Sequence, residues 1–447
     1  MKIFINNIRE IFDNKAVSYG IFNNIFSAAS SLLTLPLIII FLTPHLQGYF
    51  YIFKSLLAIQ SLFLFGIGLV IQNFVSHEWA KINSPDRDNV YHISRIAGIR
   101  RFALNWYIFV ALITLFVLGA GGTLFIYWSE SDSYIRVIAW LPAWIVLCIV
   151  TAFNTVLALS FVFLKGTNQV LSVKQIELFK NIISRLAQWI VLAIGGSLWF
   201  FSVGAFMGLI TTLSLLLKKH KSFFKKLFSY KSKGKIIWEK EIWPLQWRFA
   251  TSWIAGYAKH SISIPILFAA HGPVIAGQLG MTWTMFMTLQ SIAGVIVVTQ
   301  MPSWAMAGAN NELSLLKGMF KKSLFQSLFI FCTGGLVISI LVAALSAGDN
   351  IIANRILSLL PTIVLAIGFL CENIKHTMVN LIWSQKKEPF WKLNIAEGFL
   401  AFVVFPYMGV KFGVMGLLVS FLAFSIISTL IVYIIFRSFF NITLKSD

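Results

Sequence analysis

The residues best suited to chemistry are a lysine and a histidine inside an apolar stretch of sequence. Lys259 and His260 lie within the apolar run 246–270. In a helix rising 1.5 Å per residue, Lys259 would be ~16–20 Å from either end of that run. A lysine at such depth in a membrane costs ~2.5–3.5 kcal/mol on insertion scales, and it usually faces a cavity or an opposite charge. The depth of Lys259 in this apolar run therefore predicts that it has a functional role.

The same run carries more polar side chains than a lipid-facing helix accommodates. Gln246 and Tyr257 are among them, and several others fall at helical spacing on a single face. We hypothesise that this stripe lines a hydrated, cationic cavity. The alternative is a salt bridge from Lys259 to Glu372 or Glu397. The stripe consists of Arg248, Thr251, Ser252, Lys259 and Ser263.

Further ionisable residues lie closer to the ends of apolar runs. Glu372, Lys375 and His376 stand at positions i, i+3 and i+4, so they can pair on one helix surface or take part in proton coupling. Arg248 and Glu397, like Lys54 near the opposite boundary, can reach a membrane surface by snorkelling. We take Lys259, Arg248, His260, Lys54, Gln246 and Tyr257 as candidate substrate contacts, and Glu372, His376 and Glu397 as candidate coupling groups.

A cationic cavity in a low-dielectric protein attracts anions, and the heads of lysine and arginine suit phosphate. An anion that is embedded in the membrane and large enough to need two moving lobes suggests a lipid-linked pyrophosphate. No GxxxxGK[ST] loop is present to bind ATP, so a proton or sodium gradient, a voltage or the cargo gradient must supply the energy. The three cysteines are far apart and predict neither a metal site nor a disulfide framework. We expect no cofactor and no enzymatic activity.

The elements that must position these residues are membrane-spanning helices. The chain has 447 residues, of which 58% are apolar and only 12% charged, about half the charged fraction of a soluble protein. Runs of about 20 apolar residues, the length that crosses a bilayer, occur twelve times to within about one helix. The predicted spans are 17–42, 50–74, 102–127, 137–164, 182–196, 199–217, 246–270, 276–300, 323–346, 356–380, 393–405 and 414–436.

The distribution of basic residues predicts which way the chain is threaded. With twelve spans, 31 of the 36 lysines and arginines fall on the side of the two termini, three fall on the other side and two lie inside spans. Lysine and arginine favour cytoplasmic loops, so both termini are predicted to be cytoplasmic. This accounts for the net charge of +20 without nucleic acid. Residues 1–15 predict an interfacial amphipathic helix and no signal peptide.

A lysine-rich segment and an internal repeat divide the chain into two six-helix lobes. The predicted parts are an N-terminal lobe (1–217), a polybasic cytoplasmic linker (218–241), a C-terminal lobe (242–437) and a cytoplasmic tail (438–447). We therefore expect an all-α polytopic membrane protein whose lobes form a parallel repeat around a central site. The repeat pairs Pro36, Pro44 and Gly48 with Pro265, Pro273 and Gly277 at a constant offset of 229.

Two groups of segments carry a resemblance to a known family. The first group is 48–60 and 72–78, and the second is 243–248, 252–257 and 272–281 together with Pro265. They resemble the second helix, and the seventh helix with its following loop, of O-antigen flippases, members of the multidrug, oligosaccharidyl-lipid and polysaccharide exporter superfamily. The chain departs from the family at Gly66–Leu69, where many relatives carry an acidic residue, so a carboxylate-based cation site there is in doubt.

The resemblance implies that the protein flips an undecaprenyl-pyrophosphate-linked oligosaccharide across the bacterial inner membrane, from the cytoplasmic to the periplasmic leaflet. It implies the bilayer, an O-antigen polymerase and a chain-length regulator as partners, with Arg248 and Lys259 contacting pyrophosphate or acidic sugars. The alternatives are an ion-coupled multidrug exporter or a peptidoglycan-precursor flippase. An exporter of cationic drugs would carry carboxylates in the N-terminal lobe, where the predicted spans contain none. Short outside loops argue against a polymerase or glycosyltransferase.

Overall fold

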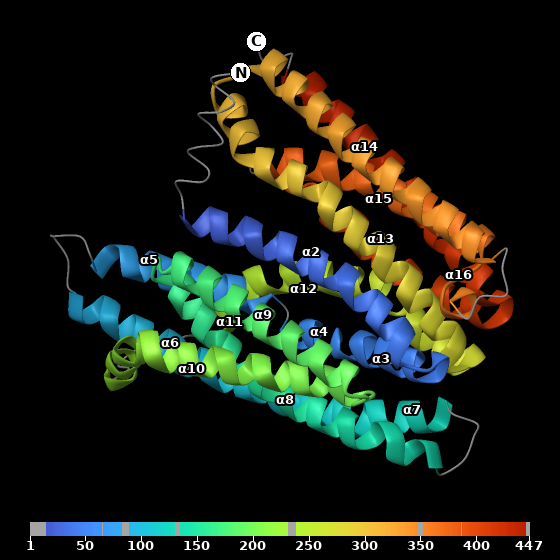
Figure 1. The fold of residues 1–447 in the computed structure, drawn as a ribbon. Helices are drawn as coiled ribbons and strands as arrows, with labels where there is room; N and C mark the ends of the chain where they lie inside the picture. Colours follow the sequence, from blue (N-terminus) through green and yellow to red (C-terminus); the bar gives the residue numbers. More distant parts are fainter. Residues whose placement is uncertain are drawn as a thin grey trace. The chain divides into compact units, whose positions relative to one another are not determined.

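A computed structural model describes residues 15–64, 66–82, 89–129, 135–230, 238–346, 352–385 and 387–443. Every regular element in these ranges is helical, as Figure 1 shows. The all-helical prediction is therefore confirmed for this part of the chain. The amphipathic helix predicted at the N-terminus lies almost wholly outside the described residues.

The described chain forms two compact units whose boundaries fall inside helices. Unit 1 comprises the chain up to Ser30 together with Leu56–Trp253, and unit 2 comprises Ser31–Ser55 together with the chain from Ile254 onward. The chain thus passes from one unit to the other within α2 (Lys15–Phe41), α3 (Pro44–Leu57) and α12 (Trp243–His260). The predicted lobe boundaries, by contrast, fall at the ends of spans.

The remaining helices of unit 1 follow α3 in chain order. They are α4 (Gln60–Leu64), α5 (Ile67–Ile82), α6 (Asn89–Phe116), a π-helical turn η1 (Val117–Gly122), α7 (Thr123–Ser129), α8 (Ile135–Gly166), α9 (Val170–Ala193), α10 (Trp199–Ser229) and α11 (Trp238–Glu241). The remaining helices of unit 2 are α13 (Ser263–Ala309), α14 (Leu313–Ser346), a 3₁₀ turn η2 (Ala353–Arg355), α15 (Leu359–Ser384) and α16 (Trp391–Thr443).

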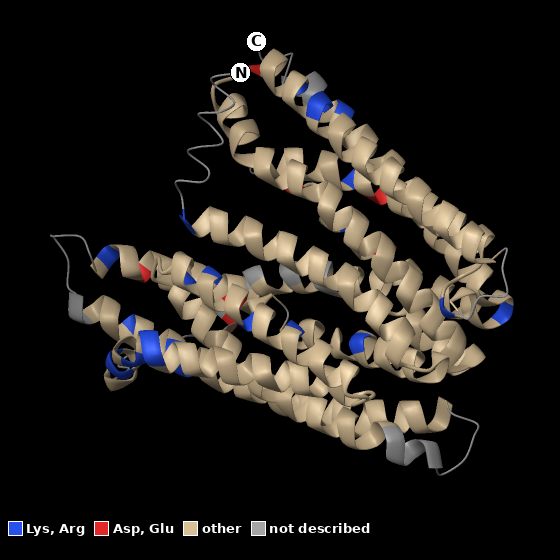
Figure 2. Ribbon diagram, in the orientation of Figure 1, with Lys and Arg blue, Asp and Glu red and all other residues tan. Residues whose placement is uncertain are grey.

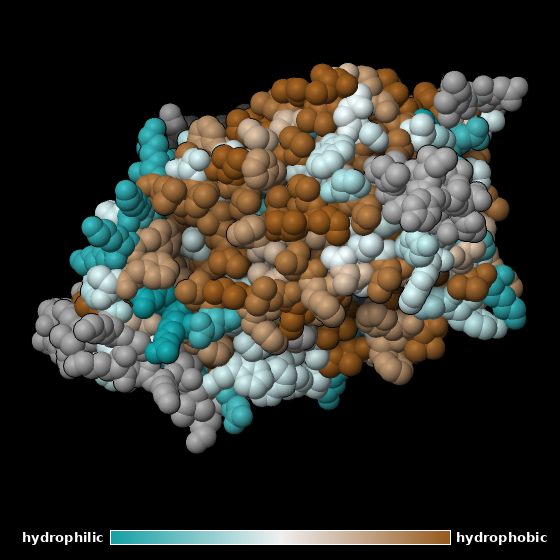
Figure 3. Space-filling view, turned by 90° about the horizontal axis from the view of Figure 1, so that it is seen from below, coloured by the Kyte–Doolittle hydropathy of each residue, from teal (hydrophilic) through white to brown (hydrophobic). Residues whose placement is uncertain are grey.

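Eight helices of the described chain are long and apolar enough to cross a membrane, and α3–α5 adds a ninth if that bent series counts as one span. The chain is accordingly a multi-pass membrane protein. Its surface agrees with this conclusion, because Figure 3 shows apolar side chains over much of the face it presents, and Phe116, Phe325 and Trp128 are 75%, 71% and 78% exposed. The number twelve remains a prediction.

Two of the long helices are interrupted by glycines in conformations that other residues rarely adopt. Gly272 in α13 has φ 83° and ψ 176°, and Gly413 in α16 has φ 63° and ψ −149°. Both backbone conformations lie in a region populated almost only by glycine. The breaks divide α13 and α16 into two arms each, close to where the sequence predicts a boundary between spans.

Several helices extend beyond the predicted spans, and this changes where the basic residues lie. The span predicted to begin at Ile182 is part of α9, which already begins at Val170 after a short turn containing Asn168 at φ 63°. Lys174 and Lys180 are therefore on a helix rather than in a loop. The 31 residues of α10 span ~46 Å, more than a ~30 Å hydrocarbon core. Figure 2 shows lysines gathered at its C-terminal end.

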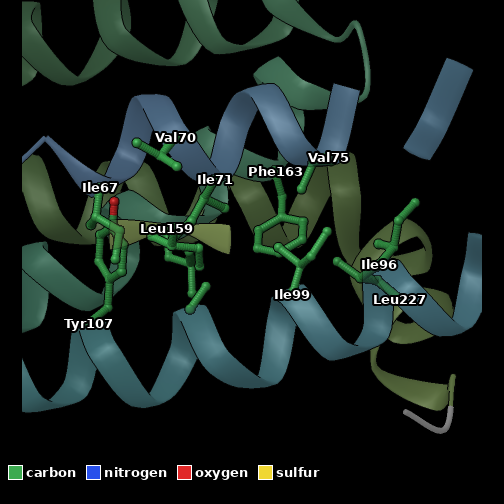
Figure 4. Packing of buried hydrophobic residues seen from close by; sticks show 12 residues of the cluster. Ile67, Val70, Ile71, Val75, Ile96, Ile99, Tyr107, Leu159, Phe163 and Leu227 are labelled. Carbon is green, nitrogen blue, oxygen red and sulfur yellow. The ribbon is translucent and has the colours of Figure 1, made fainter. Parts of the chain in front are cut away.

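Unit 1 has an apolar core built from helices that the chain brings together from distant positions. Val70, Ile71 and Val75 of α5 pack against Ile99 of α6 and Phe163 of α8, as Figure 4 shows. All five side chains are at most 3% exposed. Because lipid tails are as apolar as these side chains, close van der Waals packing rather than the hydrophobic effect holds such helices together in a membrane. This packing fixes the positions of α5, α6 and α8 within the unit.

Residues that the repeat relates to one another meet inside unit 2. Gly48 of α3 lies so close to the backbone of Pro273 that an added Cβ would be 2.0 Å from its carbonyl oxygen. A Cβ on Gly277 would likewise be 3.0 Å from the backbone nitrogen of Gly48. Gln47 strengthens the crossing by donating from Nε2 to the carbonyl oxygens of Gly277 and Arg355, at 3.0 and 2.8 Å. The glycines noticed in the sequence thus mark a close helix crossing.

Candidate functional site

Four charged side chains form a compact cluster inside unit 2. Lys259 Nζ lies 2.6 Å from Glu372 Oε1 and 3.5 Å from Glu397 Oε1. Lys375 Nζ lies 2.9 Å from Glu372 Oε2 and 3.8 Å from Glu397 Oε2. Each carboxylate therefore bridges both lysines, and the formal charges of the four side chains cancel.

The two carboxylates of this charge cluster are held unequally. Glu372 is within 3 Å of both lysines, and only 1% of its side chain is exposed. Glu397 makes the two longer contacts, and 12% of its side chain is exposed. Lys375 also donates to Ser428 Oγ at 3.2 Å. Glu397 is thus the more weakly bound and more accessible of the two acids.

Local sequence explains how three helices bring these groups together. Glu372 and Lys375 are three residues apart on α15, so they share a helix face. Glu397 is adjacent to Gly398, where an added Cβ would lie 2.6 Å from Ala255 Cα. The missing side chain lets α16 approach α12 one turn before Lys259. Both arms of α16 contribute, because Glu397 precedes the break at Gly413 and Ser428 follows it.

His260 lies among aromatic side chains and within electrostatic reach of Glu372. Its ring centroid is 6.3 Å from that of Trp283 and 6.4 Å from that of Phe421. Trp283 and Phe421 contact one another at 4.8 Å, and Phe369 lies 5.2 Å from Trp283. The Nδ1 atom of His260 is buried and has no hydrogen-bond partner among the described residues. The ring of His260 therefore packs among aromatic side chains, and its Nδ1 atom is left available for a hydrogen bond.

The other predicted residues each have surroundings of their own. Lys54 is exposed on α3 and donates to Thr284 Oγ1 at 3.4 Å, whereas Tyr257 is half-buried on α12. Gln246 is fully buried and accepts a hydrogen bond of 2.8 Å from Trp238 Nε1. His376 is exposed on α15, directly after Lys375, and it is within electrostatic reach of Glu372. Arg248 belongs to α12, but its side chain lies outside the described part of the structure.

Of the predicted polar stripe, the structure describes the side chains of Thr251, Lys259 and Ser263. Lys259 is 4% exposed and lies between two carboxylates, which is the salt-bridge alternative stated for the sequence. The stripe also crosses a unit boundary, since Arg248 belongs to unit 1 and Lys259 to unit 2. In addition, α12 ends at His260, so Ser263 begins another helix. The 3.6-residue period identified the polar positions but could not reveal where the helix ends.

Unit 1 also holds a carboxylate that precedes the span predicted at 182–196 but lies on the same helix, α9. Glu177 on α9 accepts from Lys165 at 3.2 Å and from Lys174 at 2.9 Å. The predicted spans themselves contain no carboxylate, so Glu177 adds a helical position that the apolar runs did not include. The helix begins earlier than hydropathy indicates because paired charges lower the local hydropathy without disrupting the helix.

Two lysines held side by side present six N–H donors, a number suited to several anionic oxygens. Charge-assisted hydrogen bonds of this kind are about twice as strong as neutral ones. The sequence analysis named three of the four residues as site candidates and treated Lys375 only as a partner of Glu372. Ser428 was missed, because nothing distinguishes one serine in an apolar helix.

Comparison of the sequence with family models and with curated proteins gives no match. Comparison of the fold with solved structures gives several matches. The structure "Lipid II flippase MurJ, inward closed conformation" aligns with 94% of this chain and 87% of its own, with TM-score 0.62 and 14% identity. An inward-facing multidrug resistance MATE family transporter of the MOP superfamily aligns with 94% and 99%, with TM-score 0.59 and 9% identity.

A third similar structure is a MOP superfamily transporter from Pyrococcus furiosus. It aligns with 96% of this chain and 96% of its own, with TM-score 0.52 and 11% identity. At such identities the likeness concerns the fold alone. The described chain therefore has the fold found in MOP superfamily transporters, and its substrate must be argued from its own residues.

Proposed function

We propose that this chain is a flippase that carries an undecaprenyl-pyrophosphate-linked O-antigen unit from the cytoplasmic to the periplasmic leaflet of the bacterial inner membrane. The fold supports a transporter, since the similar solved structures include one described as a lipid II flippase. The sequence resemblance to O-antigen flippases supports the cargo. Alternating access between two lobes, each of six spans with both termini cytoplasmic, is part of the proposal.

The proposal rests on the different distances at which the two carboxylates contact the lysines of the charge cluster. Glu397 contacts them at 3.5 and 3.8 Å, whereas Glu372 contacts them at 2.6 and 2.9 Å. In our proposal the pyrophosphate of the cargo displaces the carboxylate of Glu397 while Glu372 keeps the lysines ordered. Lys259 and Lys375 then exchange one anion for another, and neither is left buried without a counter-charge.

The displacement would also move a helix. Glu397 lies on the first arm of α16, which joins the second arm through the glycine break at Gly413. Release of Glu397 removes two ionic contacts from that arm, so cargo binding and helix position would be linked. A proton or sodium gradient could drive the return step by acting on Glu372, His376 or Glu397. No cofactor is required by this scheme.

Reconstitution into vesicles tests the proposal. The purified chain is incorporated with a fluorescent undecaprenyl-pyrophosphate oligosaccharide, and the leaflet that holds the probe is measured with and without a proton gradient. We expect protein-dependent movement of the probe between leaflets. If the native protein leaves the probe where it was added but exports cationic dyes, the flippase proposal is wrong.

A single carboxamide substitution tests the displacement step. Glu397→Gln removes the carboxylate that competes with the cargo, so we expect the pyrophosphate probe to bind several-fold more tightly. Glu388→Gln is the matched control, because Glu388 is exposed in the segment between α15 and α16. Unchanged binding in the Glu397 variant would contradict displacement even if the native protein flips lipid.

The runner-up is an ion-coupled multidrug exporter, supported by the MATE structures of similar fold and by the presence of Glu177 in unit 1. A cationic drug needs an unpaired carboxylate. Glu177 is already bound by Lys165 and Lys174, and Glu372 is bound by Lys259 and Lys375. These pairings favour an anionic cargo. A peptidoglycan precursor is another anionic candidate, and substitution of its lipid-linked sugar in the same assay tests it.

A further inference from the structure

A cavity of about 290 Å³ lies within unit 1, remote in sequence from the charge cluster. This volume is near the lower end of the ~300–1,000 Å³ range of small-molecule sites. Helices α2, α8, α9 and α10 all contribute to its wall. The lining residues are Asn23, Asn154, Leu157, Ala158, Phe161, Glu177, Lys180, Asn181 and Thr212.

The cavity gathers three asparagines, which is unusual for helices that cross a membrane. Asn23 and Asn154 lie inside candidate spans, and Asn181 is on the neighbouring α9. Polar groups are expensive at such depth unless they have partners. Asn154 has no side-chain hydrogen bond to any described residue, so helix packing alone does not account for it.

The two other asparagines form a pair that still has capacity to bind. Asn181 Nδ2 donates to Asn23 Oδ1 at 2.8 Å. That bond leaves the amide oxygen of Asn181 and the amide N–H₂ group of Asn23 available. Flipping both side-chain amides by 180° still leaves one oxygen and one N–H₂ group available. A hydroxyl group both donates and accepts, so it can bridge this pair. Adjacent hydroxyls on a ring would complement the pair together with Asn154.

The charges around the cavity do not cancel. Both oxygens of Glu177 are occupied by Lys165 and Lys174, as described above. Lys180 has no ion pair within 4 Å among the residues that the structure describes. Three lysines and one glutamate leave a formal excess of two positive charges, and Lys180 is the lysine that lines the cavity.

The helix packing directs Lys180 along the wall. A Cβ added to Gly208 would lie 3.5 Å from Lys180 Cγ and 3.6 Å from Lys180 Cε, so the stem of Lys180 occupies the surface that Gly208 leaves open. Thr212 follows one turn later on α10, and its hydroxyl donates to the Gly208 carbonyl at 2.9 Å. Leu157, Ala158 and Phe161 add apolar surface to the lining, on the face of α8 that also carries Asn154.

We propose that this cavity binds one acidic sugar residue of the cargo, with its hydroxyls on Asn23, Asn154 and Asn181 and its carboxylate on Lys180. A saccharide ring presents polar edges and an apolar face, and the cavity offers both kinds of surface. The assignment of the sugar to the cargo rests on the proposed function. Binding of the sugar itself can be measured without transport.

Titration calorimetry on the purified full-length chain, in a detergent without sugar, tests the proposal. The probes are p-nitrophenyl β-D-glucuronide and p-nitrophenyl β-D-glucoside, which differ only in the carboxylate. The native chain should bind the glucuronide more tightly by about tenfold, as a charge-assisted hydrogen bond provides. Failure of the native chain to bind either probe overturns the site.

Three variants assign the contacts. Lys180→Gln should lower glucuronide affinity to that of the glucoside and leave glucoside affinity unchanged. Asn154→Leu should weaken both probes, and its matched control is Asn24→Leu, because Asn24 is an exposed neighbour of Asn23 that does not line the cavity. Glucuronide binding that survives both Lys180→Gln and Asn154→Leu overturns the proposal. So does stronger competition by phosphatidylglycerol than by the glucoside, which would assign the cavity to a lipid headgroup.

The vesicle assay separates this inference from the proposed function. Sugar binding without lipid movement would retain the site and refute the flippase. Lipid movement with no selective binding of the glucuronide would retain the flippase and refute the site. If both hold, Lys180→Gln should slow the flipping of an acidic oligosaccharide more than that of a neutral one.

Discussion

Glu372 is central to the charge cluster because it contacts both lysines: Lys259 at Oε1, and Lys375 at both oxygens, 3.0 Å from Oε1 and 2.9 Å from Oε2. Removal of its charge leaves Lys259 and Lys375 with only the longer contacts to Glu397. A buried charge that loses its partner costs about 3–5 kcal/mol, whereas replacement of a whole pair by apolar groups is often neutral. The stability of unit 2 should therefore depend more on charge balance than on any one of these residues.

A comparison of single and paired substitutions tests this dependence. Glu372→Gln should lower the thermal unfolding midpoint of the detergent-solubilised chain, with a loss of about 3–5 kcal/mol. The double variant Lys259→Met with Glu372→Met should recover part of that loss because it removes opposite charges together. Glu388→Gln, on an exposed segment, should change stability by less than about 0.5 kcal/mol. Equal midpoints for Glu372→Gln and the native chain would show that the cluster contributes nothing to folding.

The sequence reveals most members of the cluster but not the way they meet. Lys259, Glu372 and Glu397 are conspicuous because a charge in an apolar run is costly. Their pairing brings together residues of three helices that are far apart in the sequence, such as Lys259 and Glu397, which are 138 residues apart. The asparagines of the unit 1 cavity carry no formal charge, so hydropathy did not single them out. Their occurrence at matching depth becomes apparent only when the helices are placed together.

At the scale of helices, close packing at small residues determines where charged groups lie. Gly398 allows α16 to contact Ala255 of α12, and this contact is adjacent to the Glu397–Lys259 pair. Gly398→Ala should force the helices apart and destabilise the chain by about 1–3 kcal/mol. The thermal midpoint measures the effect. Gly256→Ala is the matched control on α12, since a Cβ there meets no atom within 4 Å, and it should be neutral or stabilising.

The break at Gly272 allows backbone strain to be separated from steric contact. A Cβ at this position meets nothing within 4 Å, so any loss must come from the φ of 83°. Gly272→Ala should cost about 1–3 kcal/mol. Gly294→Ala, in the same helix and equally free of contacts, should not destabilise. Equal thermal midpoints for the two variants would indicate that the break can straighten without cost.

The apolar runs predicted the existence of most helices but not their lengths. A helix continues as long as its backbone hydrogen bonds are made, whether or not the membrane continues with it. Thus α10 extends past Leu217 into lysine-rich sequence, and α9 begins before its apolar part. The glycine breaks in α13 and α16 were close to predicted boundaries because loops and kinks both interrupt hydropathy.

At the scale of the whole molecule, the distribution of lysine and arginine predicts the membrane topology, with both termini in the cytoplasm. Reporter fusions to the C-terminus test it. We expect a C-terminal green fluorescent protein to be fluorescent and a C-terminal alkaline phosphatase to be inactive, because both results require a cytoplasmic end. An active phosphatase at that position would reverse the proposed topology. A second phosphatase fusion, placed between α14 and α15, should be active if the number of spans is correct.

The passage of α2, α3 and α12 between the units limits how the protein can be divided. A cut between Tyr230 and Trp238 leaves Ser31–Ser55, which belongs to unit 2, on the first fragment, and leaves 243–253, which belongs to unit 1, on the second. Neither fragment contains a complete unit. Each half expressed alone should therefore be degraded, whereas coexpressed halves should be recovered together. A gene carrying only one of the two halves should therefore yield no stable protein, because each half lacks a segment that the other supplies.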